Sequence, residues 1–128
     1  KELADLPRLN AALAKLGTPT SLLVKGGGML YSCGIPPLNP DSGEIVQGSI
    51  EEQTDAILSL MREALEGAGS SLDKVVNITI FLADNSLFSR VNSVYVDYFK
   101  SNFPARSFIA VQAWPLPFDI EISCIAVA

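Results

Sequence analysis

Two amphipathic helical segments constrain the fold of this chain more than any other feature. The segment from Ser49 to Gly67 opens with a capping box, in which Ser49 and Glu52 each satisfy a free backbone donor of the other. A second helical segment runs from Leu87 to Lys100. Apolar residues occupy one stripe of each segment: Ile57, Leu60, Met61, Ala64 and Leu65 in the first, and Phe88, Val91, Tyr95, Tyr98 and Phe99 in the second. Each helix is therefore expected to pack its apolar stripe against another apolar surface and to leave its opposite side exposed to solvent.

The remaining patterned segments predict the strands that supply this surface. β-Branched and aromatic residues predict strands over Ser21–Lys25, Met29–Cys33, Val75–Leu82, Ser107–Ala113 and Phe118–Val127. Gly26-Gly27-Gly28 predicts a tight hairpin turn between the first two, since glycine tolerates a positive φ. Leucines at helical spacing predict a short N-terminal helix that ends at Gly17. Prolines and other turn residues predict a long loop over residues 34–48.

These elements predict a single domain over residues 1–128, with residues 1–17 as an N-terminal helical extension. The expected class is α+β, a two-layer sandwich in which one mixed sheet carries both long helices on one face. The other sheet face then has nothing in the chain to cover its apolar side chains. On the central strand these are either Val76, Ile78, Ile80 and Leu82 or their alternates Val75 and Phe81. The sequence therefore predicts self-association through the uncovered face.

Composition excludes several functional classes. Nine Lys and Arg against fourteen Asp and Glu give a net charge of −5, which argues against nucleic acid as a partner. The chain contains no histidine, which excludes Ser-His-Asp and Cys-His catalytic systems and histidine-ligated metals. Its two cysteines cannot form a four-thiolate zinc site. Without an apolar run long enough to span a membrane or a signal-peptide pattern, we expect a cytoplasmic protein with no membrane partner.

Arg106 and Glu121 are the strongest candidate site residues. Arg106 begins an otherwise apolar strand, where it either pairs with an acid at the sheet end or grips a carboxylate or phosphate through two parallel hydrogen bonds. Glu121 lies in mid-strand between isoleucines, where a carboxylate is costly unless it is paired or hydrated. It is either an exposed edge residue or a base that positions water.

Asn92 and Cys33 are weaker candidates. Asn92 lies on the apolar stripe of the second helix, where a buried amide usually satisfies nearby backbone groups. Cys33 ends a predicted strand directly before the long loop. Because no histidine is available to activate its thiol, we interpret Cys33 as a small buried apolar residue rather than a nucleophile.

Several segments in a fixed order carry a resemblance to a known family. They are Cys33-Gly34-Ile35-Pro36-Pro37-Leu38-Asn39-Pro40, Ser42-Gly43-Glu44, Gln53-Thr54, Phe88 with Asn92 and Tyr95, Phe103-Pro104-Ala105-Arg106-Ser107, and Ile120-Glu121-Ile122. With these segments in register, the chain resembles the reactive-intermediate deaminase family, also called the Rid or YjgF family. The resemblance extends over nearly the whole chain after the N-terminal helix.

The resemblance implies a chorismate-mutase-like subunit that forms a homotrimer, with sites in the clefts between subunits. It also implies hydrolysis of reactive 2-imino acids and enamines to 2-oxo acids and ammonia, without a cofactor. In that scheme Arg106 grips the substrate carboxylate, and Glu121 holds or activates the attacking water. Backbone groups around Cys33 and Gly34 contact the substrate, and Asn92 supports the site.

Three parts of the chain depart from the usual pattern of the family. Thr20 stands where the family often has a tyrosine that lines the site, Cys33-Gly34-Ile35 replaces Ser-Gly-Gln, and Ser123 replaces a second acid. These changes predict a roomier and less polar pocket. The alternative prediction is therefore a non-catalytic module that binds a small carboxylate such as a 2-oxo acid. A third, a ribonuclease or translation inhibitor, is disfavoured by the acidic net charge and the lack of a basic cluster.

Overall fold

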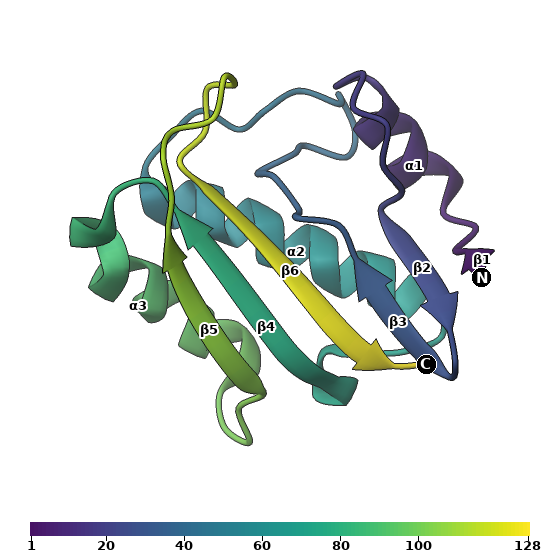
Figure 1. The fold of residues 1–128 in the computed structure, drawn as a ribbon. Helices are drawn as coiled ribbons and strands as arrows, with labels where there is room; N and C mark the ends of the chain where they lie inside the picture. The colour runs from purple at the N-terminus through teal and green to yellow at the C-terminus, as the bar shows by residue number, and fades with distance from the viewer.

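A computed structural model describes residues 1–128 and places a six-stranded sheet in front of the two long helices in Figure 1. The strands are β1 (Glu2–Leu3), β2 (Leu23–Gly26), β3 (Met29–Ser32), β4 (Val75–Leu82), β5 (Ala105–Ala110) and β6 (Ile120–Val127). Their order across the sheet is β1-β2-β3-β6-β4-β5. Only β4 and β5 run parallel, because helix α3 (Phe88–Phe99) crosses over between them. The sheet is therefore mixed, as predicted.

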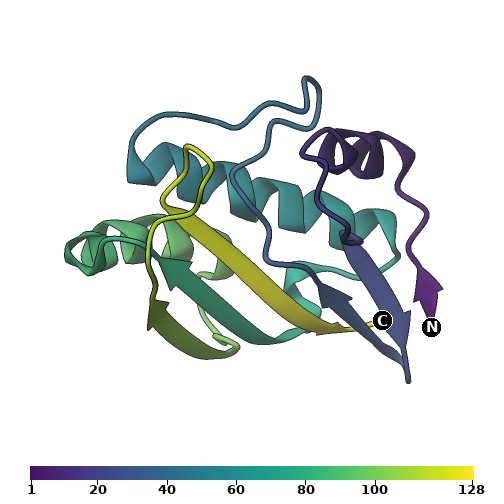
Figure 2. The same ribbon diagram turned by 45° about the horizontal axis from the view of Figure 1, so that its top comes forward.

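Helices α2 (Ile50–Gly67) and α3 cover one face of the sheet and form the second layer in Figure 2. Ser49 caps α2 and forms the predicted capping box with Glu52. The core between the layers is fully buried at Ile57, Leu58, Leu65, Ile78, Ile80, Leu82, Ile120 and Ile122. The predicted two-layer α+β class is confirmed. None of the helices is both long and apolar enough to cross a membrane.

The N-terminal helix is shorter than predicted. Helix α1 spans Pro7–Ala14, whereas Glu2 and Leu3 pair with β2 as strand β1. Pro7 explains the difference, because the residue before a proline is disfavoured in a helix, and Leu6 has φ −129° and ψ 72°. Arg8 on α1 pairs with Glu63 on α2, so α1 packs beside the C-terminal half of that helix.

The strand predicted over Ser107–Ala113 instead spans Ala105–Ala110. It is paired with β4 from Asn77 to Leu82, and it ends where β4 ends because no further backbone partner is available. Arg106 is therefore the second residue of an edge strand, rather than the residue that begins it. The hairpin turn between β2 and β3 is as predicted, with Gly27 and Gly28 at φ 58° and 77°.

The sheet face away from the helices is open, and it faces the viewer in Figure 1. Ile78, Ile80 and Leu82 point to the helices, so Phe81 marks the uncovered face of β4. A β-bulge between Val75 and Asn77 breaks the alternation and turns Val75 inward. On this face Tyr31, Ile109 and Val127 are 42% to 45% exposed, and Val76 at the bulge is 44% exposed. This exposed apolar surface supports the expectation of self-association.

A charge in the middle of the open face should block self-association. Ile125 lies on β6 between β3 and β4, and an unpaired carboxylate buried there is costly. Light scattering at micromolar concentration should give a multimer for the wild type and a monomer for Ile125→Asp. Leu3→Asp, at an exposed position on β1, is the control and should keep the wild-type mass. A wild-type protein at the monomer mass would contradict the prediction.

Candidate functional site

Arg106 projects from β5 toward the helices. Its register partner is Ile78 on β4, which is fully buried under the helical layer. The guanidinium carbon lies 4.8 Å from the ring centre of Tyr95 and 5.7 Å from that of Phe88, both on α3. Arg106 forms no salt bridge; the ion pairs of the molecule involve Arg8 and Arg90. Aromatic rings thus hold the cation, and its hydrogen-bond donors stay free for a ligand.

A cavity of about 310 Å³ opens beside the guanidinium. It is lined by Asn92, Tyr95, Val96, Phe103, Pro104 and Arg106. Asn92 Oδ1 and the Tyr95 hydroxyl are buried without a hydrogen-bond partner, and burial raises the pKa of Tyr95. Buried polar atoms are rarely left unpaired in a core, because each one costs the free energy of its lost hydration. Two such atoms beside an unpaired cation are typical of a binding site.

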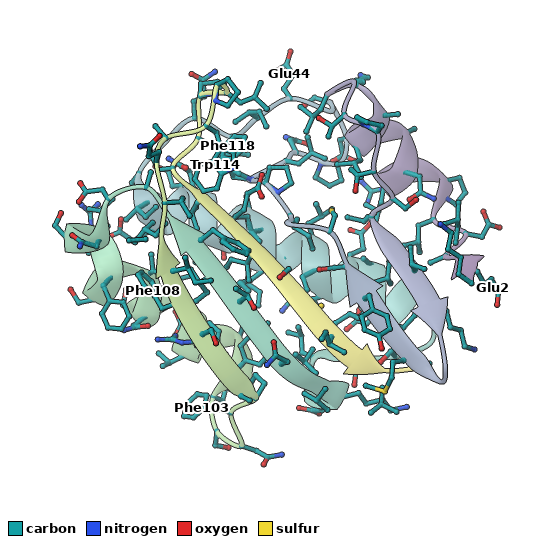
Figure 3. The ribbon with its side chains drawn as sticks, viewed as in Figure 1. Glu2, Glu44, Phe103, Phe108, Trp114 and Phe118 are labelled. Atoms are coloured by element: carbon teal, nitrogen blue, oxygen red, sulfur yellow. The ribbon has the colours of Figure 1, made fainter.

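The outer wall of this cavity is aromatic. Phe103, which Figure 3 labels near the beginning of β5, stacks on Tyr95 with ring centres 6.3 Å apart. Phe108, labelled farther along β5, meets Phe88 edge to face at 4.5 Å. The two phenylalanines therefore brace the rings that contact Arg106.

Glu121 lies on the open face of the sheet with Gly34 and Cys33. A methyl group added to Gly34 would collide with Glu121 Oε1, so a larger residue here would require the carboxylate to move from its present position. No hydrogen bond or ion pair holds Glu121, and burial raises its pKa to about 7. Burial, together with the charge of Glu121, raises the pKa of Cys33 to about 11. Cys33 is therefore a neutral thiol near pH 7, which agrees with its interpretation as a non-nucleophile.

The sheet separates Arg106 from Glu121 within one chain. Directly paired residues of neighbouring strands point to the same face. Arg106 is paired with Ile78, which points to the helices, and Glu121 is paired with Phe81, which points to the open side. One small ligand cannot touch both charged groups of the same chain.

The predicted site residues thus form two groups. Arg106 and Asn92 line the cavity next to α3, and we call them the cation group. Glu121, Gly34 and Cys33 lie together on the open face, and we call them the carboxylate group. The structure brings the members of each group together but does not join the two groups.

Thr20 lies apart from both groups. It lines a cavity of about 320 Å³ between α1 and the N-terminal strands, with Asn10 and Leu13 among its neighbours. The loss of a tyrosine at this position therefore leaves the Arg106 cavity of the same chain unchanged. No cluster of three or more acidic or cysteine side chains in residues 1–128 is arranged to hold a metal ion.

Four residues of the cavity, Tyr95, Val96, Phe103 and Pro104, were not predicted as site residues from the sequence. Tyr95 was predicted in the core stripe, and it is 3% exposed, but its ring also contacts Arg106. Val96 and Phe103 were not considered as site residues. Asn92 and Val96 lie four residues apart, so they share one face of a helix. This spacing was the only feature of the sequence to indicate that both line the same cavity wall. Phe88, predicted in the same buried stripe, is 41% exposed because its ring faces Arg106 at the sheet edge.

The matches between this chain and known proteins include the cation group and the carboxylate group. A family model described as Endoribonuclease L-PSP matches residues 9–128. The 2-iminobutanoate/2-iminopropanoate deaminase of Homo sapiens is 41% identical over 98 residues, which cover 77% of this chain and 72% of the relative. Reactive Intermediate Deaminase A, chloroplastic, of Arabidopsis thaliana is 39% identical over 126 residues, 98% of this chain and 65% of the relative. The crystal structure of the YjgF gene product from E. coli superposes with a TM-score of 0.87 at 30% identity, covering 99% and 98% of the two chains.

The carboxyl group of Glu121 should make stability depend on pH. Burial raises its pKa from 4.5 to about 7, so the unfolded chain loses this proton first as the pH rises. The fold is therefore destabilised progressively between about pH 4.5 and pH 7, and the loss is complete above pH 7. Glu121→Gln should raise Tm at pH 8 and leave it unchanged near pH 4. Glu66→Gln, at an exposed position on α2, should show no such dependence; a Glu121→Gln effect equal at both pH values would contradict the prediction.

Proposed function

Because the chain belongs to the endoribonuclease L-PSP family, also known as the reactive-intermediate deaminase or YjgF family, we propose that it hydrolyses 2-imino acids to 2-oxo acids and ammonia. Two relatives, 39% and 41% identical, are named as deaminases, and one name specifies 2-iminobutanoate and 2-iminopropanoate. Within this chain, the observation that carries the proposal is the unpaired guanidinium of Arg106 at a mostly apolar cavity.

Arg106 binds the substrate carboxylate in this proposal. A guanidinium is planar and permanently charged, and it can donate two parallel hydrogen bonds to a carboxylate. The rings of Phe88 and Tyr95 restrict where the guanidinium lies, so less freedom is lost when the ligand binds. A carboxylate held at two oxygens fixes the orientation of the neighbouring imine carbon.

Glu121 assists the attack of water on that carbon. Water forms a bond to the imine carbon while Glu121 accepts one of its protons. Glu121 passes this proton to the imine nitrogen, which gives a tetrahedral amino alcohol. It then accepts the proton of the new hydroxyl group and delivers it to the nitrogen, so that the carbon–oxygen double bond forms as the carbon–nitrogen bond breaks and ammonia leaves. A pKa of about 7 suits both steps, because acid–base catalysis is most effective when the pKa lies near the working pH. The imine carbon is already electrophilic, so the mechanism needs orientation and one positioned water rather than a cofactor or a strong nucleophile.

The two groups act together only if different chains supply them. The cation group of one chain would meet the carboxylate group of its neighbour in a cleft between subunits. The exposed apolar residues of the open face support such an assembly. We propose a homotrimer, in which three-fold symmetry would produce three equivalent sites of this kind.

The family description names an endoribonuclease, but the chemistry of this chain favours a small molecule. The net charge is −5, and Arg106 is the only charged residue that lines its cavity. Binding of an RNA backbone draws much of its affinity from several cations along a groove, because these neutralise the phosphate charges.

Replacement of Arg106 by lysine should separate its charge from its geometry. Arg106→Lys should fold and assemble normally but release ammonia from freshly generated 2-iminopropanoate about ten- to a hundredfold more slowly, since a charge-assisted hydrogen bond contributes roughly 1.5–3 kcal/mol. Arg106→Ala should be slower still. Arg62→Lys is a matched control, because Arg62 also lies over a tyrosine ring, 5.0 Å from that of Tyr98, outside the cavity.

Two other outcomes would reject parts of the proposal. If both Arg106 variants lower Tm but keep the activity of the folded protein, Arg106 is a structural residue. If the wild type binds 2-oxo acids and does not accelerate ammonia release, the chain is a carboxylate-binding module rather than an enzyme.

A further inference from the structure

We infer that the cavity beside Arg106 selects substrates with an uncharged, extended apolar side chain, and that Val96 and Phe103 determine this preference. The inference rests on the proposed function, since it places the substrate carboxylate on Arg106. It concerns the rest of the substrate, which the reaction itself does not specify.

The cavity is larger than the smallest imino acids require. Its volume of about 310 Å³ is roughly ten times that of a water molecule in the liquid. A carboxylate bound to Arg106 occupies only one part of this space. The imine derived from alanine adds a single methyl group, so it would leave most of the cavity filled with water.

The walls of the cavity are mostly apolar. Val96 is 44% exposed and Phe103 is 55% exposed, and both line the cavity together with Pro104. Apolar side chains this exposed gain free energy when a ligand removes them from water. Once the substrate carboxylate occupies Arg106, no other charged residue of the lining could pair with a second charge on the ligand. The walls therefore favour an apolar side chain and disfavour an acidic one, which the carboxylate of a neighbouring chain's Glu121 would also repel.

The wall formed by Phe103 is held in place by its neighbours. Phe103 stacks on Tyr95, which is 3% exposed and itself stacks on Phe99 with ring centres 4.6 Å apart. The turn that leads to Phe103 contains Lys100 and Asn102 at positive φ values of 59° and 54°. Such backbone angles are uncommon outside glycine, and the Lys100 N–H donates a hydrogen bond to the Val96 carbonyl, which ties the turn to the end of α3. A wall held in place this way can discriminate between substrates by shape.

The test compares imines freshly generated from L-alanine, L-leucine and L-glutamate. Each methylene group removed from water improves binding about fourfold, and an open cavity buries only part of the leucine side chain. The kcat/KM for the leucine imine should therefore exceed that for the alanine imine by about tenfold, and the glutamate imine should rank below the leucine imine. Dissociation constants of the corresponding 2-oxo acids should follow the same order.

Two variants assign the preference to the walls. Phe103→Ala should reduce the leucine-to-alanine ratio about three- to tenfold by removing the aromatic wall. Val96→Phe fills the cavity, so it should also reduce this ratio, by excluding the larger side chain. Leu3→Ala, at a position 56% exposed on β1, removes a comparable apolar group elsewhere and should leave the ratio unchanged.

The outcomes separate this inference from the proposed function. A wild-type leucine-to-alanine ratio near one, or a ratio that neither cavity variant changes, would overturn the inference while imine hydrolysis continued. If no imine is hydrolysed, the proposed function fails. The preference of the cavity for apolar side chains is then still tested by the order of the 2-oxo acid dissociation constants, and by whether Phe103→Ala and Val96→Phe abolish that order.

Discussion

Side chains of a β-strand alternate between two faces, and this constraint determines both the core and the site of the protein. Two helices cover one face of the sheet, so Ile78 and Arg106 point to the helices, whereas Phe81 and Glu121 point to the open side. The alternation thus leaves one apolar face uncovered and places the two charged groups on opposite sides. A second copy of the chain against the first, as proposed above, would cover the apolar face and bring the two kinds of charged group together.

The two charged groups are stabilised in ways that differ from ordinary surface charges. Arg90 forms a salt bridge with Glu51 on the surface, whereas Arg106 lies against aromatic rings without an acid. Glu121 has neither a cation nor a hydrogen-bond donor, and its burial raises its pKa to about 7. An unpaired, partly buried carboxylate lowers the stability of the isolated subunit above neutral pH. A residue that is costly in this way is a candidate for a functional role, because nothing in the folding of the subunit requires it.

Local patterns in the sequence were sufficient to predict the layers of the fold and the candidate residues. The capping box at Ser49 marked the start of α2, and the position of Glu121 between isoleucines revealed its unusual environment. Long-range pairing was not predictable in the same way. The face of Arg106 depends on the register of β5 with β4, and the wall formed by Phe103 depends on a turn that local propensity does not specify. Leu3 was misassigned because helical spacing outweighed the restriction that Pro7 imposes on the residues before it.

A mixture of two variants tests most directly whether neighbouring subunits share the site. Arg106→Ala retains Glu121, and Glu121→Gln retains Arg106, so each protein alone lacks one half of every site. When the two are unfolded together in equal amounts and refolded, random assembly should pair both wild-type residues in about one quarter of the sites, and about one quarter of the wild-type activity should return. If each chain supplied both residues of its own site, no mixed assembly would contain a complete site. Activity that stays at the level of the separate variants, in assemblies shown to contain both chains, would contradict the account.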